Sequence, residues 1–176
     1  ENSGNLGYFT AFQMIYEFET QAYTTAVGKV SKVFRTEFGY HIVKVYDKRN
    51  SKGEISIRQI KIELNPSPSA EEIAEAQAKI NEVYKKLQNL EKFNILVQQY
   101  SEDASSVLKN GELAPFTMTS VRYPENFKNT AFSLQNDGDF SEPIQTASGF
   151  HILQRVRLKP LDSLNKIKNT IISKIS

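Results

Sequence analysis

The pattern of apolar and polar positions predicts a strand and a long helix in the middle of the chain. Residues 55–64, ISIRQIKIEL, alternate and are rich in Ile, as is typical of a strand. The alternation slips at Arg58–Gln59, which predicts a β-bulge. Beyond the turn residues NPSPS, apolar residues recur at helical spacing up to about Asn89. Ser69 and Glu72 are spaced to form a capping box at the start of this helix.

The second half of the chain predicts shorter elements. A helix is expected from about 91 to 100, a short strand at 112–116 and a helix over 124–134. The segments SEPIQT and GFHILQRVR form a hairpin across a turn at 147–149. This mixture of helices and strands is typical of an α+β domain. The final segment, 162–175, places Leu and Ile on one helical stripe and predicts a C-terminal helix.

Three sequence blocks occur twice, in the same order, about 110 residues apart. GNLGYF matches NGELAPF, FETQAY matches FKNTAF, and FGYHI matches SGFHI. The two histidines of the chain, His41 and His151, hold the same place in the last block. Three ordered matches are hard to obtain by chance, so the chain contains two copies of one unit. Fewer residues precede the first copy, so it is expected to be incomplete.

The repeat predicts the domain organisation. Residues 1–48 are expected to be the C-terminal part of a first domain, 49–54 a linker, 55–158 a complete second domain and 159–176 a C-terminal helix. Because the chain begins without Met, we expect it to be a piece of a longer protein. The first copy would lack its own first strand and expose strand edges. We therefore expect it to borrow a strand or helix from a neighbouring chain, by self-association, or to pack in an altered way against the second domain.

Composition narrows the classes of function. The net charge is +2 and forms no basic stripe, so a nucleic-acid partner is not expected. The absence of cysteine excludes disulfides, thiolate metal sites and a Cys nucleophile. The longest apolar runs are too short for a membrane span. The hydrophobic content of 39% is sufficient for a packed core.

The repeated motifs resemble those of the parvulin-type (rotamase, PpiC-like) peptidyl-prolyl cis/trans isomerases. The first copy carries GNLGYFTAFQMIYEFE and FGYHIVKV; the second carries YSEDASS, GELAPF, SVRYPENF and SGFHILQRV. The resemblance implies an antiparallel four-stranded sheet with flanking helices. It also implies tandem domains similar to those of bacterial chaperone-isomerases, a periplasmic or cell-envelope location, and unfolded or proline-containing polypeptides as clients.

The implied reaction makes and breaks no covalent bond. Uncatalysed rotation about an X-Pro bond takes tens to hundreds of seconds. In the transition state the amide is twisted and has lost its resonance. Catalysis needs an apolar cup for the proline ring and polar groups that favour the twisted amide, in a place with little water. No metal, cofactor or covalent nucleophile is expected.

The resemblance also assigns site residues. The proline cups would consist of Leu6, Met14 and Phe18 in the first copy and of Leu113, Val121 and Phe127 in the second. The catalytic group would consist of paired positions at Lys61 and His151, the acidic position at Asp103, and His41 in the first copy. Thr146 and Ser148 match hydroxyl positions beside the second histidine.

The second copy departs from the family pattern at four positions. Lys61 replaces a histidine, Ala114 and Pro115 replace a glycine and an aromatic residue, and Val121 replaces a methionine. Lys61 could form an ion pair with Asp103 or could be a solvated strand residue. Two functions therefore remain open: a prolyl isomerase that assists folding, or a weak or inactive relative that binds client peptides as a chaperone.

Overall fold

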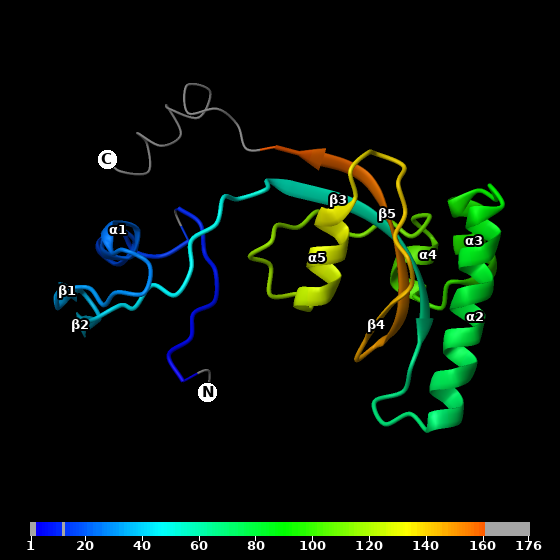
Figure 1. Cartoon of the computed structure of the whole chain (residues 1–176), viewed down its shortest axis with the longest axis horizontal. Helices are drawn as coiled ribbons and strands as arrows, with labels where there is room; N and C mark the ends of the chain where they lie inside the picture. Colours follow the sequence, from blue (N-terminus) through cyan, green and yellow to red (C-terminus); the bar gives the residue numbers. More distant parts are fainter. Residues whose placement is uncertain (1–2, 12, 161–176) are drawn as a thin grey trace. The chain divides into compact units, whose positions relative to one another are not determined.

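The computed structural model describes residues 3–11 and 13–160, and the chain divides into two compact units, Glu1–Ser51 and Lys52–Ser176 (Figure 1). They are called unit 1 and unit 2 below. The helix expected over 159–176 lies outside the described residues except for its first two positions. The described helices include none that is both long and apolar enough to cross a membrane.

Unit 2 is organised around an antiparallel sheet. Its strands are β3 (Glu54–Glu63), β4 (Ile144–Thr146) and β5 (Gly149–Lys159), in the spatial order β3-β5-β4. The fourth expected strand, 112–116, runs along the free edge of β3 but makes only two isolated bridges, at Glu112 and Phe116. Pro115 in this segment has no N–H to donate, which limits regular pairing.

The helices of unit 2 cover both faces of this sheet (Figure 1). They are α2 (Ala70–Gln88), α3 (Phe93–Tyr100), α4 (Ala104–Val107) and α5 (Glu125–Ser133). Helices α2 and α3 pack on the face that carries Ile60 and Ile152, and α5 packs on the face that carries Ile57 and Leu153. The capping box predicted at the start of α2 is present: the Ser69 hydroxyl accepts from the Glu72 amide and the Glu72 carboxylate from the Ser69 amide.

The structure corrects one detail of the predicted strand β3, both faces of which are buried. The pairing of β3 with β5 does shift, but between Ser56 and Ile57, earlier than the expected bulge at Arg58–Gln59. Gln59 and Ile60 are both buried because they face opposite covered sides of the sheet. The apparent slip in the alternation arises because the Ile residues change from one face of the strand to the other at this point. The pairing with β5 remains regular there.

Unit 1 repeats part of this arrangement. It contains α1 (Tyr16–Thr24) and a hairpin of β1 (Phe34–Thr36) and β2 (Gly39–His41). The loop before the hairpin is tied to the following segment by the Ser31 amide, which donates to Val43 O at 2.8 Å, and by the Val43 amide, which donates to Ser31 Oγ at 3.0 Å. Ser141 and Leu153 make the same pair of bonds in unit 2, at 2.8 and 3.0 Å. The repeat is thus present in the backbone hydrogen bonding as well as in the sequence.

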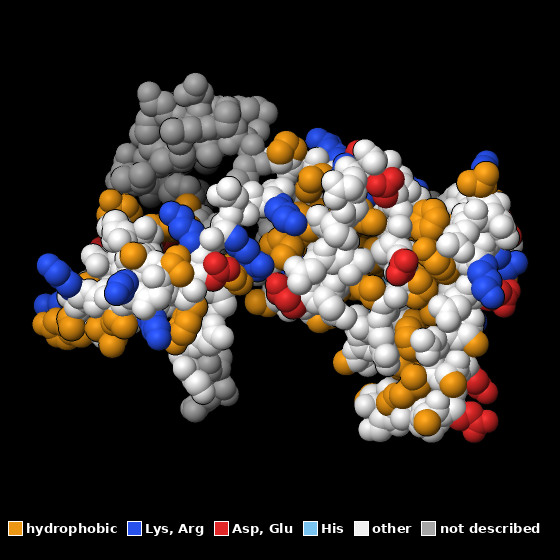
Figure 2. Space-filling view, in the orientation of Figure 1, with side chains coloured by type: hydrophobic (Ala, Val, Ile, Leu, Met, Phe, Trp, Pro, Cys, Tyr) orange, Lys and Arg blue, Asp and Glu red, His pale blue; other side chains and the backbone are white. Residues whose placement is uncertain are grey.

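Within the described residues of unit 1, 3–11 and 13–51, nothing covers one face of the hairpin. Tyr40 and Ile42 are 75% and 63% exposed, whereas the matching residues of unit 2, Phe150 and Ile152, are 4% and 0% exposed. Figure 2 shows hydrophobic side chains gathered on the surface near this hairpin. In unit 2 the equivalent face is covered by α2 and α3, so the exposed side chains are the ones that the repeat would bury.

Candidate active site

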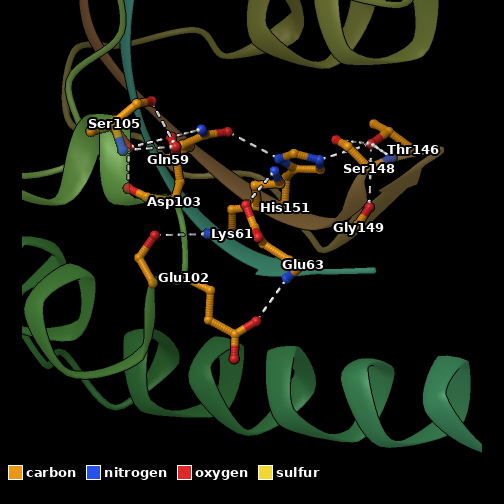
Figure 3. Close-up of polar contacts among 12 residues, drawn as sticks. Gln59, Lys61, Glu63, Glu102, Asp103, Ser105, Thr146, Ser148, Gly149 and His151 are labelled. Atoms are coloured by element: carbon orange, nitrogen blue, oxygen red, sulfur yellow. Dashed lines mark hydrogen bonds and ion pairs between the residues drawn. The ribbon is translucent and has the colours of Figure 1, made fainter. Parts of the chain in front are cut away.

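A chain of hydrogen-bonded polar side chains crosses β3 and β5 on the face of the sheet covered by α5 (Figure 3). His151 Nδ1 lies 2.9 Å from Gln59 Oε1, and Gln59 Nε2 donates to Asp103 Oδ2 at 2.6 Å. At the other side of the ring, His151 Nε2 lies 2.8 Å from Thr146 Oγ1. Gln59 reaches the histidine because it lies diagonally across the strand pair, on the same face as His151.

The direction of the hydrogen bonds fixes the protonation of His151. The Asp103 carboxylate only accepts, so the Gln59 amide must donate to it with its nitrogen and present its oxygen to the ring. His151 therefore carries its proton on Nδ1, and Nε2 accepts from the Thr146 hydroxyl. Burial, together with the positive charge of Lys61, lowers the pKa of His151 to about 4, although Asp103 opposes the shift. The imidazole is neutral at pH 7.

Asp103 is held as a carboxylate by the residues at the start of α4. It is the N-cap residue of that helix and accepts from the Ser105 amide, the Ser105 hydroxyl and the Ser106 hydroxyl, at 3.2, 2.7 and 2.5 Å. Burial by itself would raise the pKa of Asp103, but the hydrogen bonds donated by Ser106, Ser105 and Gln59 outweigh it and hold the pKa below its usual value.

The structure corrects the expected partner of His151. Lys61 is directly opposite His151 in the strand register, but its ammonium group pairs with Glu63 at 2.9 Å and not with Asp103. Gln59 instead joins Asp103 to His151. The sequence contained a signal for this residue: Gln59 continues the buried odd positions Ile55 and Ile57, and an amide supplies both a donor and an acceptor there.

Phe127 forms the apolar wall beside the histidine. Its ring is 2% exposed and lies edge-to-face with His151, with centroids 5.4 Å apart and planes at 89°. Leu113 packs against the same cluster. Met118, which was not among the expected site residues, packs there too.

Val121 does not join this wall, which corrects its assignment to the cup. Its side chain is fully exposed, and Tyr123 instead stacks on Phe127 at 4.8 Å with planes 10° apart. Relative to unit 1, two extra residues lie between Phe116 and Phe127. The residue four positions before Phe127 is therefore Tyr123, just as Met14 stands four positions before Phe18. Tyr123, and not Val121, therefore covers one side of the Phe127 ring.

Unit 1 carries the same local arrangement around its own histidine. His41 Nε2 lies 2.8 Å from Thr36 Oγ1, and Phe18 lies edge-to-face with the ring at 6.0 Å and 87°. Met14 is half-buried and Leu6 is exposed. The repeated threonine, histidine and phenylalanine therefore share one geometry in both units. Over residues 3–11 and 13–160, no group of acidic or histidine side chains is arranged to hold a metal ion.

Comparison with known protein families identifies this arrangement. A family model described as the PPIC-type PPIASE domain matches residues 60–157, more than half of the chain. The chain belongs to the PPIC-type PPIase family. A second model with the same description matches residues 1–49. The recognition of parvulin motifs in the sequence, and the α+β fold with an antiparallel sheet that it implied, are confirmed.

The relatives of this chain include proteins named as a chaperone and as a foldase. It is 30% identical over 172 residues to the chaperone SurA of Pseudomonas aeruginosa, covering 94% of this chain and 39% of that protein. It is 26% identical over 166 residues to the foldase protein PrsA 2 of Listeria monocytogenes, covering 93% and 56%. A crystal structure of a peptidylprolyl isomerase (PrsA) from Bacillus cereus matches 70% of this chain and 42% of that one, with a TM-score of 0.53 and 27% identity. The chain thus spans between about a third and just over half of the curated relatives.

Proposed function

We propose that unit 2 catalyses cis/trans isomerisation of X-Pro bonds in unfolded or folding polypeptides. The observation that carries this proposal is the neutral His151, fixed between Gln59 and Thr146 and lying against the Phe127 ring. These groups combine an apolar surface with oriented dipoles in a region of little water. Such a place favours a twisted amide, because water hydrogen bonds to the carbonyl stabilise the planar form. A rate gain of ~10⁴ corresponds to roughly 5.5 kcal/mol of barrier lowering.

Each part of the proposed site has a separate task. The Phe127 and Leu113 side chains contact the proline ring. His151 and Thr146 hold their hydrogen-bonding groups near the rotating amide, while Asp103 positions His151 through Gln59 without touching the substrate. None of these tasks calls for a metal, a cofactor or a covalent intermediate.

Prolyl isomerase activity is tested by replacing Gln59, which the structure places in the polar chain, and Lys61, which it does not. We expect Gln59→Leu to lower kcat/KM by about 10- to 100-fold, because His151 and Asp103 each lose an oriented partner. Lys61→Gln is the matched control on the same face of the same strand, and we expect it to change kcat/KM less than about threefold. Exchange NMR on a short peptide with one X-Pro bond measures both variants.

The outcomes of that experiment are distinct. A loss of activity in Lys61→Gln with none in Gln59→Leu would show that Lys61, and not Gln59, is the functional partner of His151. An X-Pro peptide that binds wild-type protein without any exchange would favour the second candidate function, a chaperone module that holds clients. The observation that favours this alternative is the closure of the site, where His151 and Phe127 are both almost fully buried.

We also propose that residues 1–48 and 55–158 correspond to a partial first and a complete second PPIase domain, as the repeat predicts. The two family matches, to residues 1–49 and 60–157, support this division. A periplasmic or cell-envelope location remains a proposal that rests on the family resemblance. The chaperone and foldase names of the relatives support folding polypeptides as clients.

Self-association through unit 1 remains a prediction from the incomplete repeat. We expect the chain to associate in a concentration-dependent way through the hairpin face that carries Tyr40 and Ile42, since this exposed apolar face would otherwise contact water. Sedimentation velocity over a hundredfold range of concentration measures this association. Tyr40→Ser combined with Ile42→Ser is expected to abolish it, whereas Leu108→Ser, at an exposed apolar position of unit 2, is the control. A monomer at every concentration would contradict the prediction.

A further inference from the structure

Tyr123 occupies the flat side of the Phe127 ring. The two rings are nearly parallel, with centroids 4.8 Å apart, and Tyr123 also lies 4.6 Å from Phe116. Elsewhere, Phe127 contacts His151 edge-to-face and packs in the cluster that includes Ala131 and Leu153. A proline ring that entered the site and packed flat on Phe127 would need the space that the Tyr123 ring fills.

The hydroxyl of Tyr123 is poorly accommodated in this position. It is buried, and the structure gives it no hydrogen-bond partner. A buried hydroxyl without a partner destabilises the state that contains it, because its hydrogen bonds to water are lost and not replaced. Met14, at the matching place in unit 1, has no such group. The stacked position of Tyr123 therefore combines a favourable ring contact with an unfavourable hydroxyl contact.

The segment that carries Tyr123 is separate from the regular structure. Residues 117–124 form no helix or strand, and they include the two-residue insertion relative to unit 1. Val121 is fully exposed, and α5 begins only at Glu125. A hydrogen bond from Lys128 Nζ to Ser120 O, at 3.1 Å, holds the segment against α5. Apart from Pro124, the N-cap residue of α5, whose carbonyl accepts from the Lys128 amide, residues 117–123 take no part in the strands or in α5.

We propose that Tyr123 is an internal occupant of the proline site, which leaves the Phe127 ring when a client proline binds there. The proposal rests on the proposed isomerase function and adds a gate to the same site. Binding of a proline ring then exchanges one flat apolar contact on Phe127 for another. It also releases the Tyr123 hydroxyl to water, so the displaced side chain regains the hydrogen bonds that it lacks in the closed state.

Two substitutions of Tyr123 are expected to change peptide affinity in opposite directions. Tyr123→Met removes the aromatic stacking and reproduces the residue of unit 1, so we expect an X-Pro peptide to bind about three- to tenfold more tightly. Tyr123→Phe keeps the ring and removes the unpartnered hydroxyl, which stabilises the closed state. We expect that variant to bind the same peptide about three- to tenfold more weakly. Val121→Met, on the same segment with its side chain in solvent, is the control and should bind like wild type.

The experiment is an NMR titration of the whole chain with a tetrapeptide that contains one X-Pro bond. It measures the dissociation constant and the nuclear Overhauser contacts between the Tyr123 and Phe127 rings. Loss of these contacts on saturation, with the opposite shifts in affinity, supports the gate. Wild-type protein that turns over or binds the peptide while the contacts persist overturns the gate and leaves the isomerase proposal standing. Shifts of Tyr123→Met and Tyr123→Phe in the same direction also overturn it. Absence of binding in wild type and in Tyr123→Met would overturn both proposals.

Discussion

Replacement of Phe127 by alanine is expected to lower the free energy of unfolding of unit 2 by about 3–5 kcal/mol, the usual range for a buried phenylalanine. The ring is 2% exposed and is the common neighbour of Phe116, Tyr123 and His151. Its removal leaves a cavity and takes away three aromatic contacts, each of which adds to the loss of buried area. Urea unfolding followed by amide signals of unit 2 measures the change.

The Phe127 prediction also concerns function. Because the Phe127 ring is the proposed contact surface for the substrate proline, Phe127→Ala should abolish measurable isomerisation. This holds even at low temperature, where the variant stays folded. Phe38→Ala removes the same atoms from a position that is 75% exposed, and we expect it to change the free energy of unfolding by less than about 0.5 kcal/mol. A loss below about 1 kcal/mol for Phe127→Ala would show that the Phe127 ring is not the centre of this cluster.

Acidification is the second large effect that we expect, and His151 is its cause. The pKa of this residue falls from 6.5 in an unfolded chain to about 4 in the folded one, since burial and the charge of Lys61 disfavour the imidazolium form. Between those two values the unfolded chain binds more protons than the folded chain. The stabilisation is complete above about pH 7 and is lost as the pH falls from about 6.5 to about 4. The full loss amounts to about 3 kcal/mol.

Replacement of His151 by a residue that does not titrate isolates this contribution. In His151→Gln the stability should change much less over the same range of pH, so the difference between wild type and variant reveals the His151 effect. The chain has only two histidines, and His41→Gln assigns their imidazole NMR signals. Titration of the His151 signal with a midpoint near 6.5 would contradict both the burial of the ring and the predicted pH dependence.

The amino-acid pattern was sufficient for most elements of unit 2 and for the family. The Ile-rich strand, the capped helix at Ser69 and the hairpin around His151 follow from rules that act over a few residues. The repeat predicted a relation between the units that reappears as matching hydrogen bonds at Thr36–His41 and Thr146–His151. These features are local, since each depends on neighbours close in the chain or one strand away.

The hydrogen-bond and packing partners of the residues within the site were harder to predict, because they depend on which residues face each other across the sheet. Lys61 and Gln59 both lie on the face of His151, and only the three-dimensional geometry shows that the amide bridges to Asp103 while the ammonium turns to Glu63. Likewise, an insertion of two residues decided whether Val121 or Tyr123 meets Phe127. A motif aligned without that insertion assigns the wrong side chain.

Patterns in the amino-acid sequence were therefore sufficient for the family, the α+β class and the repeat. Only the packed fold shows that Gln59 completes the polar chain and that the histidine is buried and neutral. The physical reason is distance along the chain. Periodicity and capping act between near neighbours, whereas the hydrogen bonds of Gln59 join it to Asp103, 44 positions away, and to His151, 92 positions away. Only packing of the chain sets those contacts.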